Sequence, residues 1–409
     1  MNYSLLPLAR LALRRVCLVL LLCSLSATGA AAGQEFTIVD QARLAGKAQS
    51  KGPTLEQMAG AMLMFGFRGT TFSDPNPFLE WVRSGKVGHV ILFDKDHLTG
   101  GPRNIGAQKE VRQLTATLKD AARGPFLIAV DQEGGKVRRL KPGAGYIDTP
   151  SAESMGRGKP ENTRALARLM GEELHDLGIQ VNMAPVADVN TNPDNPAIGA
   201  LGRSFNADPA LVTRHALAFG QAMQEEKIIP VLKHFPGHGS SVADTHAGQA
   251  DITATWNSMA DLKPFVDAIG SRWPGMIMTG HLTHTKLDPV YPASLSKLIT
   301  QDMLRSTLGW NGVVVTDDLQ MDAIATRFSL EETILLAVNA GADILLFGNN
   351  LRWDPLLPET VHGTLMQLIR KGAITSERVR ESWERITGLY YSYYGVNLSS
   401  VRPPLVRIH

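Results

Sequence analysis

The sequence has 409 residues, of which 44% are hydrophobic and 20% are charged, and its formal net charge is +2. This composition is typical of a globular protein with a substantial core, and the near-neutral charge gives no indication of a nucleic-acid or anionic-membrane partner. The length is compatible with two or three domains, or with one α/β barrel, because such barrels often exceed about 250 residues as a single unit.

The first 32 residues have the pattern of a secretory signal peptide. Arg10, Arg14 and Arg15 form a basic segment, residues 16–25 form an uncharged apolar run, and residues 30–32 are alanines that offer a cleavage site. The apolar run is shorter than the roughly 20 residues that a bilayer span requires. We therefore expect no stable membrane span, with an uncleaved anchor as the alternative, and we predict an exported protein that is periplasmic or secreted.

Cleavage after Ala32 would change the cysteine content and the charge of the mature chain. Cys17 and Cys23 both precede this position, so the mature protein would have no disulfide and no thiolate chemistry. Cleavage would also remove three arginines and no acids, which changes the formal charge from +2 to −1. Residues 33–53 are polar and weakly patterned, and we interpret them as a linker.

From about residue 54 the chain alternates short apolar runs with longer stretches of helical periodicity. Continuous apolar runs are typical of strands that are buried on both faces, as in parallel sheets. Eight such runs with helices between them predict an α/β fold of the (β/α)8 TIM-barrel type, with a doubly wound open sheet as the alternative. The eight strand candidates are residues 62–65, 89–93, 126–130, 180–184, 229–232, 276–279, 313–316 and 344–347.

Helix signals support this alternation near the C-terminus. Ser329 and Glu332 have the spacing of a capping box, and Gly341 marks the end of the helix that would follow them. Two more helical patterns, at residues 357–370 and 377–391, follow the last predicted strand. We therefore expect a single catalytic domain at residues 54–396, with a tail at residues 397–409.

Charged and polar side chains follow the predicted strands. In a barrel of this type, function resides in the loops that follow the C-terminal ends of the strands, so these side chains would gather at one end. They are Asp131, Glu133 and Arg139 after the third strand, Asp188 and Arg203 after the fourth, Lys233 and His234 after the fifth, His281 after the sixth, and Asp317 and Asp318 after the seventh.

Each of these residues also has a purely structural interpretation. Asp317 or Asp318 would be suited to cap a helix that begins near Leu319. Arg139 and Arg203 would be suited to structural ion pairs, and Glu133 to a pair with Lys136 or with an arginine. His281 is interpreted as a hydrogen-bonded inner histidine, and His238 as a residue that stabilises its own glycine-flanked turn.

The segment KHFPGHGSSVADTH, residues 233–246, concentrates titratable groups in a stretch too irregular for a helix or a strand. A metal site would use Asp244 and His246 with another histidine, but Lys233 would repel a cation and no helical histidine pair is present, so we expect no metal. No glycine-rich phosphate loop or dinucleotide fingerprint follows any predicted strand, and we expect no cofactor. Acid–base chemistry fits better, because Asp244 is placed to orient the imidazole of His246 while Asp317 serves as a nucleophile.

Four motifs carry a resemblance to a known family: KHFPGHG followed by Asp-Thr-His, AVDQEGGKVRR, GRSF and GVVVTDD. Together, and in their order along the chain, they resemble glycoside hydrolase family 3, and most closely its single-domain bacterial β-N-acetylhexosaminidases. The resemblance extends from about residue 54 to residue 394. Lys136 is a small departure, because many relatives have arginine there.

The resemblance implies a retaining glycosidase that removes terminal β-linked N-acetylglucosamine from peptidoglycan fragments or chitooligosaccharides. It implies that Asp317 is the nucleophile that forms a covalent glycosyl-enzyme intermediate, and that His246, oriented by Asp244, is the general acid/base in place of the usual second carboxylate. The positions that would bind the sugar hydroxyls and the acetamido group are Asp131, Arg139, Arg203, Lys233 and His234.

Two other functions stay open on the sequence. A family 3 enzyme for non-acetylated sugars, such as a β-glucosidase, commonly takes its acid/base from a second domain, whereas the Asp244-Thr-His246 loop points to the acetylated substrate. A non-catalytic sugar-binding barrel is disfavoured because Asp317, Asp244 and His246 are all present.

Overall fold

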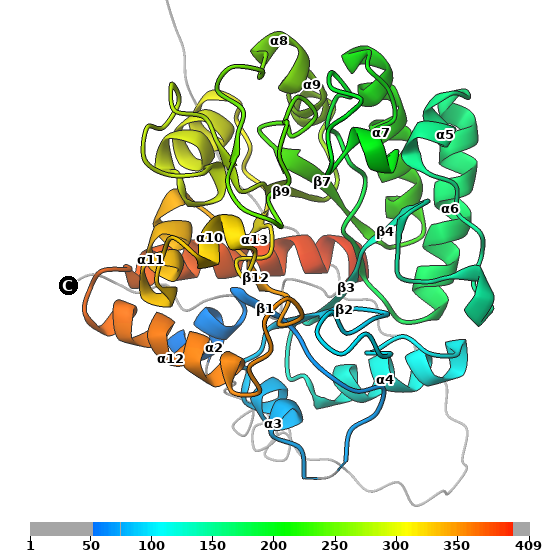
Figure 1. Cartoon of the computed structure of the whole chain (residues 1–409). Helices are drawn as coiled ribbons and strands as arrows, with labels where there is room; N and C mark the ends of the chain where they lie inside the picture. The colour runs from blue at the N-terminus through cyan, green and yellow to red at the C-terminus, as the bar shows by residue number, and fades with distance from the viewer. Residues whose placement is uncertain (1–51, 74, 396–409) are drawn as a thin grey trace, which may run out of the picture. The chain divides into compact units, whose positions relative to one another are not determined.

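The computed structural model describes residues 52–73 and 75–395, which form a barrel of eight parallel strands surrounded by helices (Figure 1). All eight strands coincide with the predicted apolar runs, so that prediction is confirmed. The strands are β1 (Leu63–Gly66), β2 (His89–Leu92), β3 (Leu127–Val130), β6 (Val181–Asn182), β7 (Ile229–Phe235), β9 (Met276–Thr279), β11 (Val314–Thr316) and β12 (Leu345–Phe347).

The strands follow one another in the order β11, β9, β7, β6, β3, β2, β1 and β12, and neighbouring strands are parallel. The two ends of this order meet, because Val315 of β11 forms a parallel bridge with Ile344 immediately before β12. The N–H group of Thr316 donates to the carbonyl of Ile344 at 3.0 Å. The sheet is therefore a nearly closed barrel, and the alternative of an open doubly wound sheet is wrong.

Helices follow most of the strands and cover the outside of the barrel. One of them, α11, begins with the predicted capping box of Ser329 and Glu332 and ends at Gly341, whose φ of 112° favours glycine. The helices are α2 (Leu55–Gly60), α3 (Pro77–Ser84), α4 (Gln108–Ala121), α5 (Ala152–Gly156), α6 (Pro160–Asp176), α7 (Pro209–Glu225), α8 (Ser258–Asp261), α9 (Lys263–Gly270), α10 (Asp322–Ala325), α11 (Leu330–Ala340), α12 (Leu357–Arg370) and α13 (Ser376–Tyr394), with a π-helix at Leu298–Thr307.

Alternate residues of the strands enter two different apolar clusters. In β1, Met64 belongs to an inner cluster to which every barrel strand contributes, whereas Leu63 and Phe65 belong to the cluster that includes the surrounding helices. All three side chains are fully buried. Because a strand inside an α/β barrel has no solvated face, this double burial explains why its residues read as continuous apolar runs.

The last helix, α13, closes the N-terminal end of the barrel and crosses the strands in Figure 1. Its Ile386 and Tyr393 belong to the inner cluster. The hydroxyl of Tyr393 donates to the carbonyl of Pro274 at 3.0 Å, just before β9, and that of Tyr394 donates to the carbonyl of Lys227 at 2.8 Å, just before β7. The opposite, C-terminal end of the barrel is thus the end available for a site.

A buried carboxylate anchors this closed end. Asp343, which is fully buried just before β12, accepts hydrogen bonds from Arg305 at 2.5 Å, Arg385 at 3.1 Å and Arg378 at 3.3 Å. Arg378 and Arg385 belong to α13, so the ion cluster ties this helix to the barrel. Removal of one partner from a buried ion cluster leaves the others uncompensated, which makes Asp343 a structural residue.

Within residues 52–73 and 75–395, no helix combines the length and the apolar character that a membrane span requires. The predicted signal peptide, the predicted tail and all but the last two residues of the predicted linker lie outside the described residues.

Candidate active site

A cavity of about 620 Å³ lies at the C-terminal end of the barrel. Its floor includes apolar barrel residues such as Met278 and Leu346, and its walls come from the loops after β2, β3, β6, β7, β11 and β12. Seven of the eight predicted site residues line it, and the eighth, Asp244, contacts one of them. The seven are Asp131, Arg139, Arg203, Lys233, His234, His246 and Asp317.

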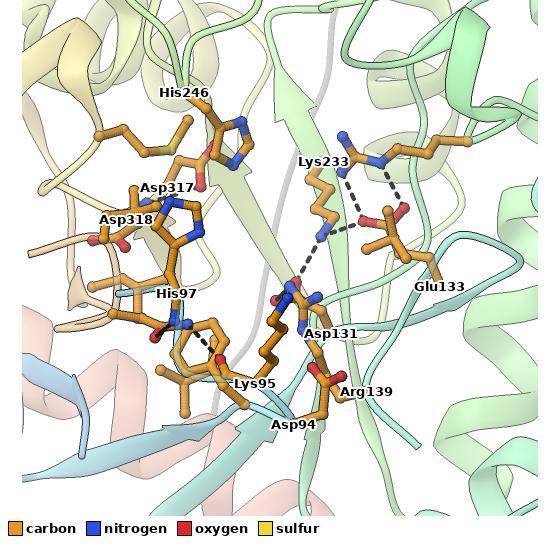
Figure 2. Close-up of a pocket in the computed structure, with 18 of the residues that line it drawn as sticks. Asp94, Lys95, His97, Asp131, Glu133, Arg139, Lys233, His246, Asp317 and Asp318 are labelled. Carbon is orange, nitrogen blue, oxygen red and sulfur yellow. Dashed lines mark hydrogen bonds and ion pairs between the residues drawn. The ribbon is translucent and has the colours of Figure 1, made fainter. Parts of the chain in front are cut away.

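One side of the cavity carries a network of five charged groups, visible on the right of Figure 2. Lys233, at the end of β7, lies at its centre: its Nζ is 3.1 Å from Asp131 and 2.8 Å from Glu133. Asp131 also accepts from Arg139 at 3.0 Å, and Glu133 accepts two parallel hydrogen bonds of 2.8 Å from Arg203. Alternation of sign along this chain holds all five side chains in place.

The network fixes the charge of its members. Burial by itself raises the pKa of Glu133, but Arg203 and Lys233 outweigh it and lower the pKa to about 2. Burial likewise opposes ionisation of Asp131, and Lys233 and Arg139 hold its pKa below the usual value. Lys233 remains a cation, because Glu133 and Asp131 raise its pKa despite burial. Neither carboxylate is therefore available as a proton donor near neutral pH.

Glu133 is the member of this network that sequence reasoning left out of the site. It was expected to pair with Lys136 or with an arginine, and the pairing with Arg203 is confirmed, whereas Lys136 donates to the carbonyl of Ala200 instead. The sequence signal that could have identified Glu133 is its position two residues after Asp131, in the segment that directly follows a barrel strand. Arg139 and Arg203 are indeed ion-pair partners, as the structural interpretation had it, but both also line the cavity.

The aspartate doublet at the end of β11 serves two different purposes. Asp318 turns its Oδ1 to the N–H groups of Gly348, at 2.9 Å, and Gln320, at 3.0 Å, which ties the loops after β11 and β12 together. Gly348 is required there, since a Cβ atom at this position would lie 2.3 Å from Asp318 Oδ2. Asp317 accepts only the N–H of Asp318, at 2.8 Å, among the hydrogen bonds of the described residues.

The two carboxyl groups also differ in pKa. Burial raises the pKa of Asp318 to about 6. Burial would raise the pKa of Asp317 too, but His281, His234 and His246 outweigh it and hold that pKa below the usual value. The prediction that one of the pair caps a helix near Leu319 is wrong, because α10 begins only at Asp322 and has no side-chain cap.

His281 occupies the inner position that was expected for it. Its ring is buried and bonds to Ser294 Oγ at 2.7 Å and to the carbonyl of Asp318 at 2.8 Å, so the interpretation as a hydrogen-bonded inner histidine is confirmed. Through its bond to the carbonyl of Asp318, His281 thereby holds the backbone of the aspartate doublet in place. His238 holds its turn through its backbone, since its N–H donates to Asp188 at 2.7 Å and its carbonyl accepts from Asn195 at 2.7 Å.

His246 lies on the side of the cavity that also carries Asp317 (Figure 2). Its Nδ1 is 2.8 Å from Asp244 Oδ1, and its backbone N–H donates to the same oxygen at 2.9 Å. Desolvation by the surrounding protein opposes protonation of this half-exposed ring, but the bond to Asp244 and the charge of Asp317 raise the pKa of His246 above its usual value. Asp244 in turn has its pKa lowered to about 2, first by the hydrogen bond from His246. Nδ1 faces Asp244, which leaves Nε2 for the cavity.

The loop that carries this pair is attached at both of its ends. On one side, Asn192 Nδ2 donates to the carbonyl of Ser241 at 2.8 Å. On the other, β8 (Ala250–Asp251) pairs with β10 (Leu282–Thr283) in the loop after β9. Between these attachments the carbonyl of Thr245 accepts from Ala323 at 3.3 Å, and the His246 side chain is 56% exposed. The imidazole thus reaches the cavity from a loop whose stems are held.

The cavity therefore combines an aspartate whose pKa is held low with a histidine whose pKa is raised, and its other wall carries a network of cationic donors. Among the residues that the structure describes, no group of three histidine, cysteine, aspartate or glutamate side chains is arranged to hold a metal ion. The arrangement suits nucleophilic and acid–base chemistry on a hydroxyl-rich ligand.

The profile described as "Glycosyl hydrolase family 3 N terminal domain" matches residues 54–389. This chain belongs to glycoside hydrolase family 3. Among its curated relatives is "Beta-hexosaminidase A" of Pseudoalteromonas piscicida, 32% identical in an alignment of 374 positions that covers 82% of this chain and 61% of the relative. "Beta-hexosaminidase LpqI" of Mycobacterium tuberculosis is 35% identical over 69% of this chain and 73% of its own length.

Solved structures of family 3 enzymes have the same fold. A β-N-acetylglucosaminidase from Paenibacillus sp. superimposes with a TM-score of 0.76 and 31% identity, over 87% of this chain and 65% of the other. A β-N-acetylhexosaminidase from Beutenbergia cavernae gives a TM-score of 0.73 and 31% identity, over 83% of this chain and 98% of the other. The family expected from the sequence motifs is therefore confirmed.

Proposed function

We propose that this protein is a retaining β-N-acetylhexosaminidase that removes terminal non-reducing β-linked N-acetylglucosamine from peptidoglycan fragments or chitooligosaccharides. The observation that carries the proposal is the Asp244–His246 pair at the cavity that also holds Asp317. A second support is the names of the relatives, which include β-hexosaminidases and β-N-acetylglucosaminidases. The chain spans only 61% of the first of these relatives, so its substrate rests on the geometry of the site.

In the first step, a carboxylate oxygen of Asp317 forms a bond to C1 of N-acetylglucosamine while the bond from C1 to the leaving oxygen breaks. His246 gives its Nε2 proton to that oxygen, so the leaving sugar departs as an alcohol. The lowered pKa of Asp317 favours the ionised form that a nucleophile requires, and the raised pKa of His246 favours the protonated ring that an acid requires. The product of this step is a glycosyl ester of Asp317 and a neutral imidazole.

In the second step, the neutral His246 takes a proton from a water molecule whose oxygen bonds to C1 as the ester bond to Asp317 breaks. Two displacements at C1 retain the β configuration. Asp244 stabilises the imidazolium in each half and keeps Nε2 directed at the cavity. No other carboxyl group lining the cavity is as well suited to exchange the proton, because Asp94, Asp131 and Glu133 are ion-paired and Asp318 binds backbone N–H groups.

The charged network on the opposite wall would hold the sugar. Arg139, Arg203 and Lys233 present donors to hydroxyl and carbonyl oxygens, while Asp131 accepts from a hydroxyl. Because each of these groups is already oriented by a protein partner, little conformational entropy is lost when the substrate binds. His234 completes the set from the end of β7.

The decisive experiment compares nitrophenyl β-glycosides of N-acetylglucosamine and of glucose. We expect hydrolysis of the acetylated substrate with kcat/KM at least about 100-fold above that of the glucoside, and no turnover of either by Asp317→Asn. Preference for the glucoside would replace the proposal with a β-glucosidase. Binding of both sugars by the wild type without turnover would make the protein a sugar-binding barrel.

Two basic side chains on the rim bear on the leaving group. Lys95 and His97, in the loop after β2, line the cavity and are exposed, and neither has an anionic partner among the described residues (Figure 2). Asp96 between them is buried and accepts from Arg68 at 2.7 Å and Arg103 at 2.6 Å, which holds the loop. This arrangement favours a leaving group that carries an acid, such as the lactyl group of muramic acid, over a neutral chitooligosaccharide.

The preference is measured as the ratio of kcat/KM for N-acetylglucosaminyl-muramic acid to that for chitobiose. Lys95→Gln should lower this ratio about 2- to 5-fold, the range for an exposed ion pair, and 0.5 M salt should reduce the difference between the two proteins. An unchanged ratio would leave chitooligosaccharides as equally good substrates.

The cellular site of action is part of the same proposal. We infer from the basic segment, the apolar run and the three alanines at the N-terminus that the protein is exported and acts in the periplasm or outside the cell. N-terminal sequencing of the protein from its native host should begin near Gly33. An intact Met1 on a cytosolic protein would contradict export.

A further inference from the structure

A buried carboxylate that lies behind the cavity joins two parts of the site. Asp188, in the loop after β6, is fully buried and is not among the residues lining the cavity. Its Oδ2 lies 2.7 Å from His234 Nδ1, and its Oδ1 accepts from the backbone N–H of His234 at 3.2 Å. The same Oδ1 accepts from the N–H of His238 at 2.7 Å. All three contacts are to the end of β7 or to the loop that follows it.

These contacts connect Asp188 both to the part of the site that would bind the sugar and to the loop that carries the acid/base. His234 lines the cavity on the sugar side, whereas His238 begins the loop that leads to His246. Asp188 is ionised, since His234 and His238 hold its pKa below the usual value in spite of burial. A buried ionised carboxylate accepts hydrogen bonds and donates none, so the proton of a neutral His234 ring must sit on Nδ1.

The position of that proton decides what His234 offers to a sugar. With hydrogen on Nδ1, the Nε2 atom carries a lone pair and accepts a hydrogen bond. A guanidinium nitrogen of Arg203 lies 3.5 Å from His234 Nε2, at the long limit of a hydrogen bond, so a sugar hydroxyl that comes closer can take its place on the single lone pair. In that position His234 accepts from the sugar, while the neighbouring Lys233 and Arg203 act as donors.

The surrounding backbone leaves little room for Asp188 or its partners to move. The carbonyl of Asp188 accepts from Ser204 Oγ at 2.6 Å, next to Arg203. Ala187 donates to the carbonyl of Lys233 at 2.6 Å. A Cβ atom on Gly239 would lie 1.8 Å from the carbonyl oxygen of Val189, so the loop after β7 contacts the Asp188 loop backbone to backbone.

We propose that Asp188 is a positioning residue that sets the proton-bearing nitrogen of His234 and fixes the first turn of the loop that carries His246. Sugar binding and placement of the acid/base then depend on one carboxylate. The inference rests on the proposed function for its kinetic consequence, whereas its structural content, the tautomer of His234 and the anchoring of His238, stands without it.

The test uses Asp188→Asn, which keeps the shape of the side chain but adds a donor. An amide N–H facing Nδ1 would favour the opposite tautomer of His234 and weaken the anchor of His238. We expect KM for nitrophenyl N-acetylglucosaminide to rise and kcat/KM to fall about 10- to 100-fold, the range for loss of a hydrogen bond to a charged group. Asp343→Asn is the matched control, because it changes a fully buried carboxylate at the closed end of the barrel, and it should lower Tm without changing KM.

A spectroscopic measurement separates this role from a merely structural one. In the wild type labelled with ¹⁵N-histidine, the neutral ring of His234, assigned with His234→Gln, should show a protonated Nδ1 and an unprotonated Nε2. The amide of His238 should exchange slowly, and in Asp188→Asn the tautomer should reverse and this exchange accelerate. A wild-type His234 with its proton on Nε2 overturns the proposal even if the variant does not fold. So does an Asp188→Asn protein with lowered Tm but unchanged KM and exchange.

Failure of this inference about Asp188 can be distinguished from failure of the proposed function. If the wild type does not hydrolyse N-acetylglucosaminides, the kinetic comparison disappears while the tautomer and exchange measurements still decide the role of Asp188. If hydrolysis occurs and the tautomer is the other one, the function stands and the role of Asp188 is lost.

Discussion

Replacement of His246 by alanine tests the least common part of the proposed mechanism, a histidine in place of a carboxylic acid. The side chain is 56% exposed on a loop, so its truncation should change the free energy of unfolding by less than about 0.5 kcal/mol. The substitution should instead lower the rate of the reaction. A poor leaving group needs the proton, whereas nitrophenolate departs with little help.

The size of the effect follows from the other acids of the cavity. Asp131 and Glu133 are ion-paired with pKa values held low, Asp94 is paired with Lys141, and Asp318 is bound to the N–H groups of Gly348 and Gln320. None of these four is free to replace the imidazole, so the full contribution of general acid catalysis should be lost. That contribution is about 10²- to 10⁴-fold, or about 3–5 kcal/mol of transition-state stabilisation.

The assay compares kcat/KM of the wild type and His246→Ala on chitobiose and on nitrophenyl N-acetylglucosaminide. We expect a loss of about 10²- to 10⁴-fold on chitobiose and a loss of less than about 10-fold on the nitrophenyl substrate. Because deglycosylation also lacks its base, the glycosyl ester of Asp317 should accumulate, visible as a burst of nitrophenolate and as added mass. Azide, which needs no base and fits where the ring was removed, should restore turnover.

Equal losses on the two substrates in a protein with unchanged Tm would refute this reasoning. Absence of both the burst and the added mass would show, in addition, that the Asp244–His246 pair only holds the loop together. The assignment of His246 as acid/base would then have to be withdrawn.

Three further predictions follow from the same geometry. Asp317→Asn should lose turnover by several orders of magnitude, and a fluorinated N-acetylglucosamine analogue should label Asp317 in the wild type; label on Asp318 would reverse the assignment within the doublet. Asp244→Asn removes a partner that raises the pKa of His246, so the alkaline limb of the profile of kcat/KM against pH should move to lower pH, and an unmoved limb would contradict the pairing. Asp343→Ala leaves its arginine partners uncompensated and should reduce the free energy of unfolding by about 3–5 kcal/mol in urea titrations, with normal activity per folded molecule; a smaller loss would show that water replaces the carboxylate.

Much of the fold is readable along the chain because its signals are local. A barrel strand is buried on both faces and must be apolar at every position, which made all eight strands visible as short runs. The capping box of Ser329 and Glu332 and the terminal Gly341 fixed α11 for an equally local reason. Once the strands are known, the parallel topology alone brings Asp131, Lys233 and Asp317 to one end.

Other features depend on contacts between residues far apart in the sequence. Asp317 and Asp318 are adjacent acids after the same strand, and only the N–H group of Gly348, thirty positions away, shows which of them supports the loops. The expectation of a helix cap failed there because a tertiary partner took the carboxylate that a local rule assigned to a helix. Glu133 was similarly ambiguous until Arg203 and Lys233 were seen around it.

The sequence by itself thus determined the strands, the ends of α11 and the set of chemical groups at the mouth of the barrel, because burial and capping act over a few neighbouring residues. Only the tertiary structure decided which of those groups pair with one another. It placed α13 across the closed end, joined Asp131, Glu133 and Lys233 into one network, and placed Asp188 behind His234. Hydrogen bonds and ion pairs depend on position in three dimensions within a few tenths of an ångström, and spacing along the chain does not specify that position.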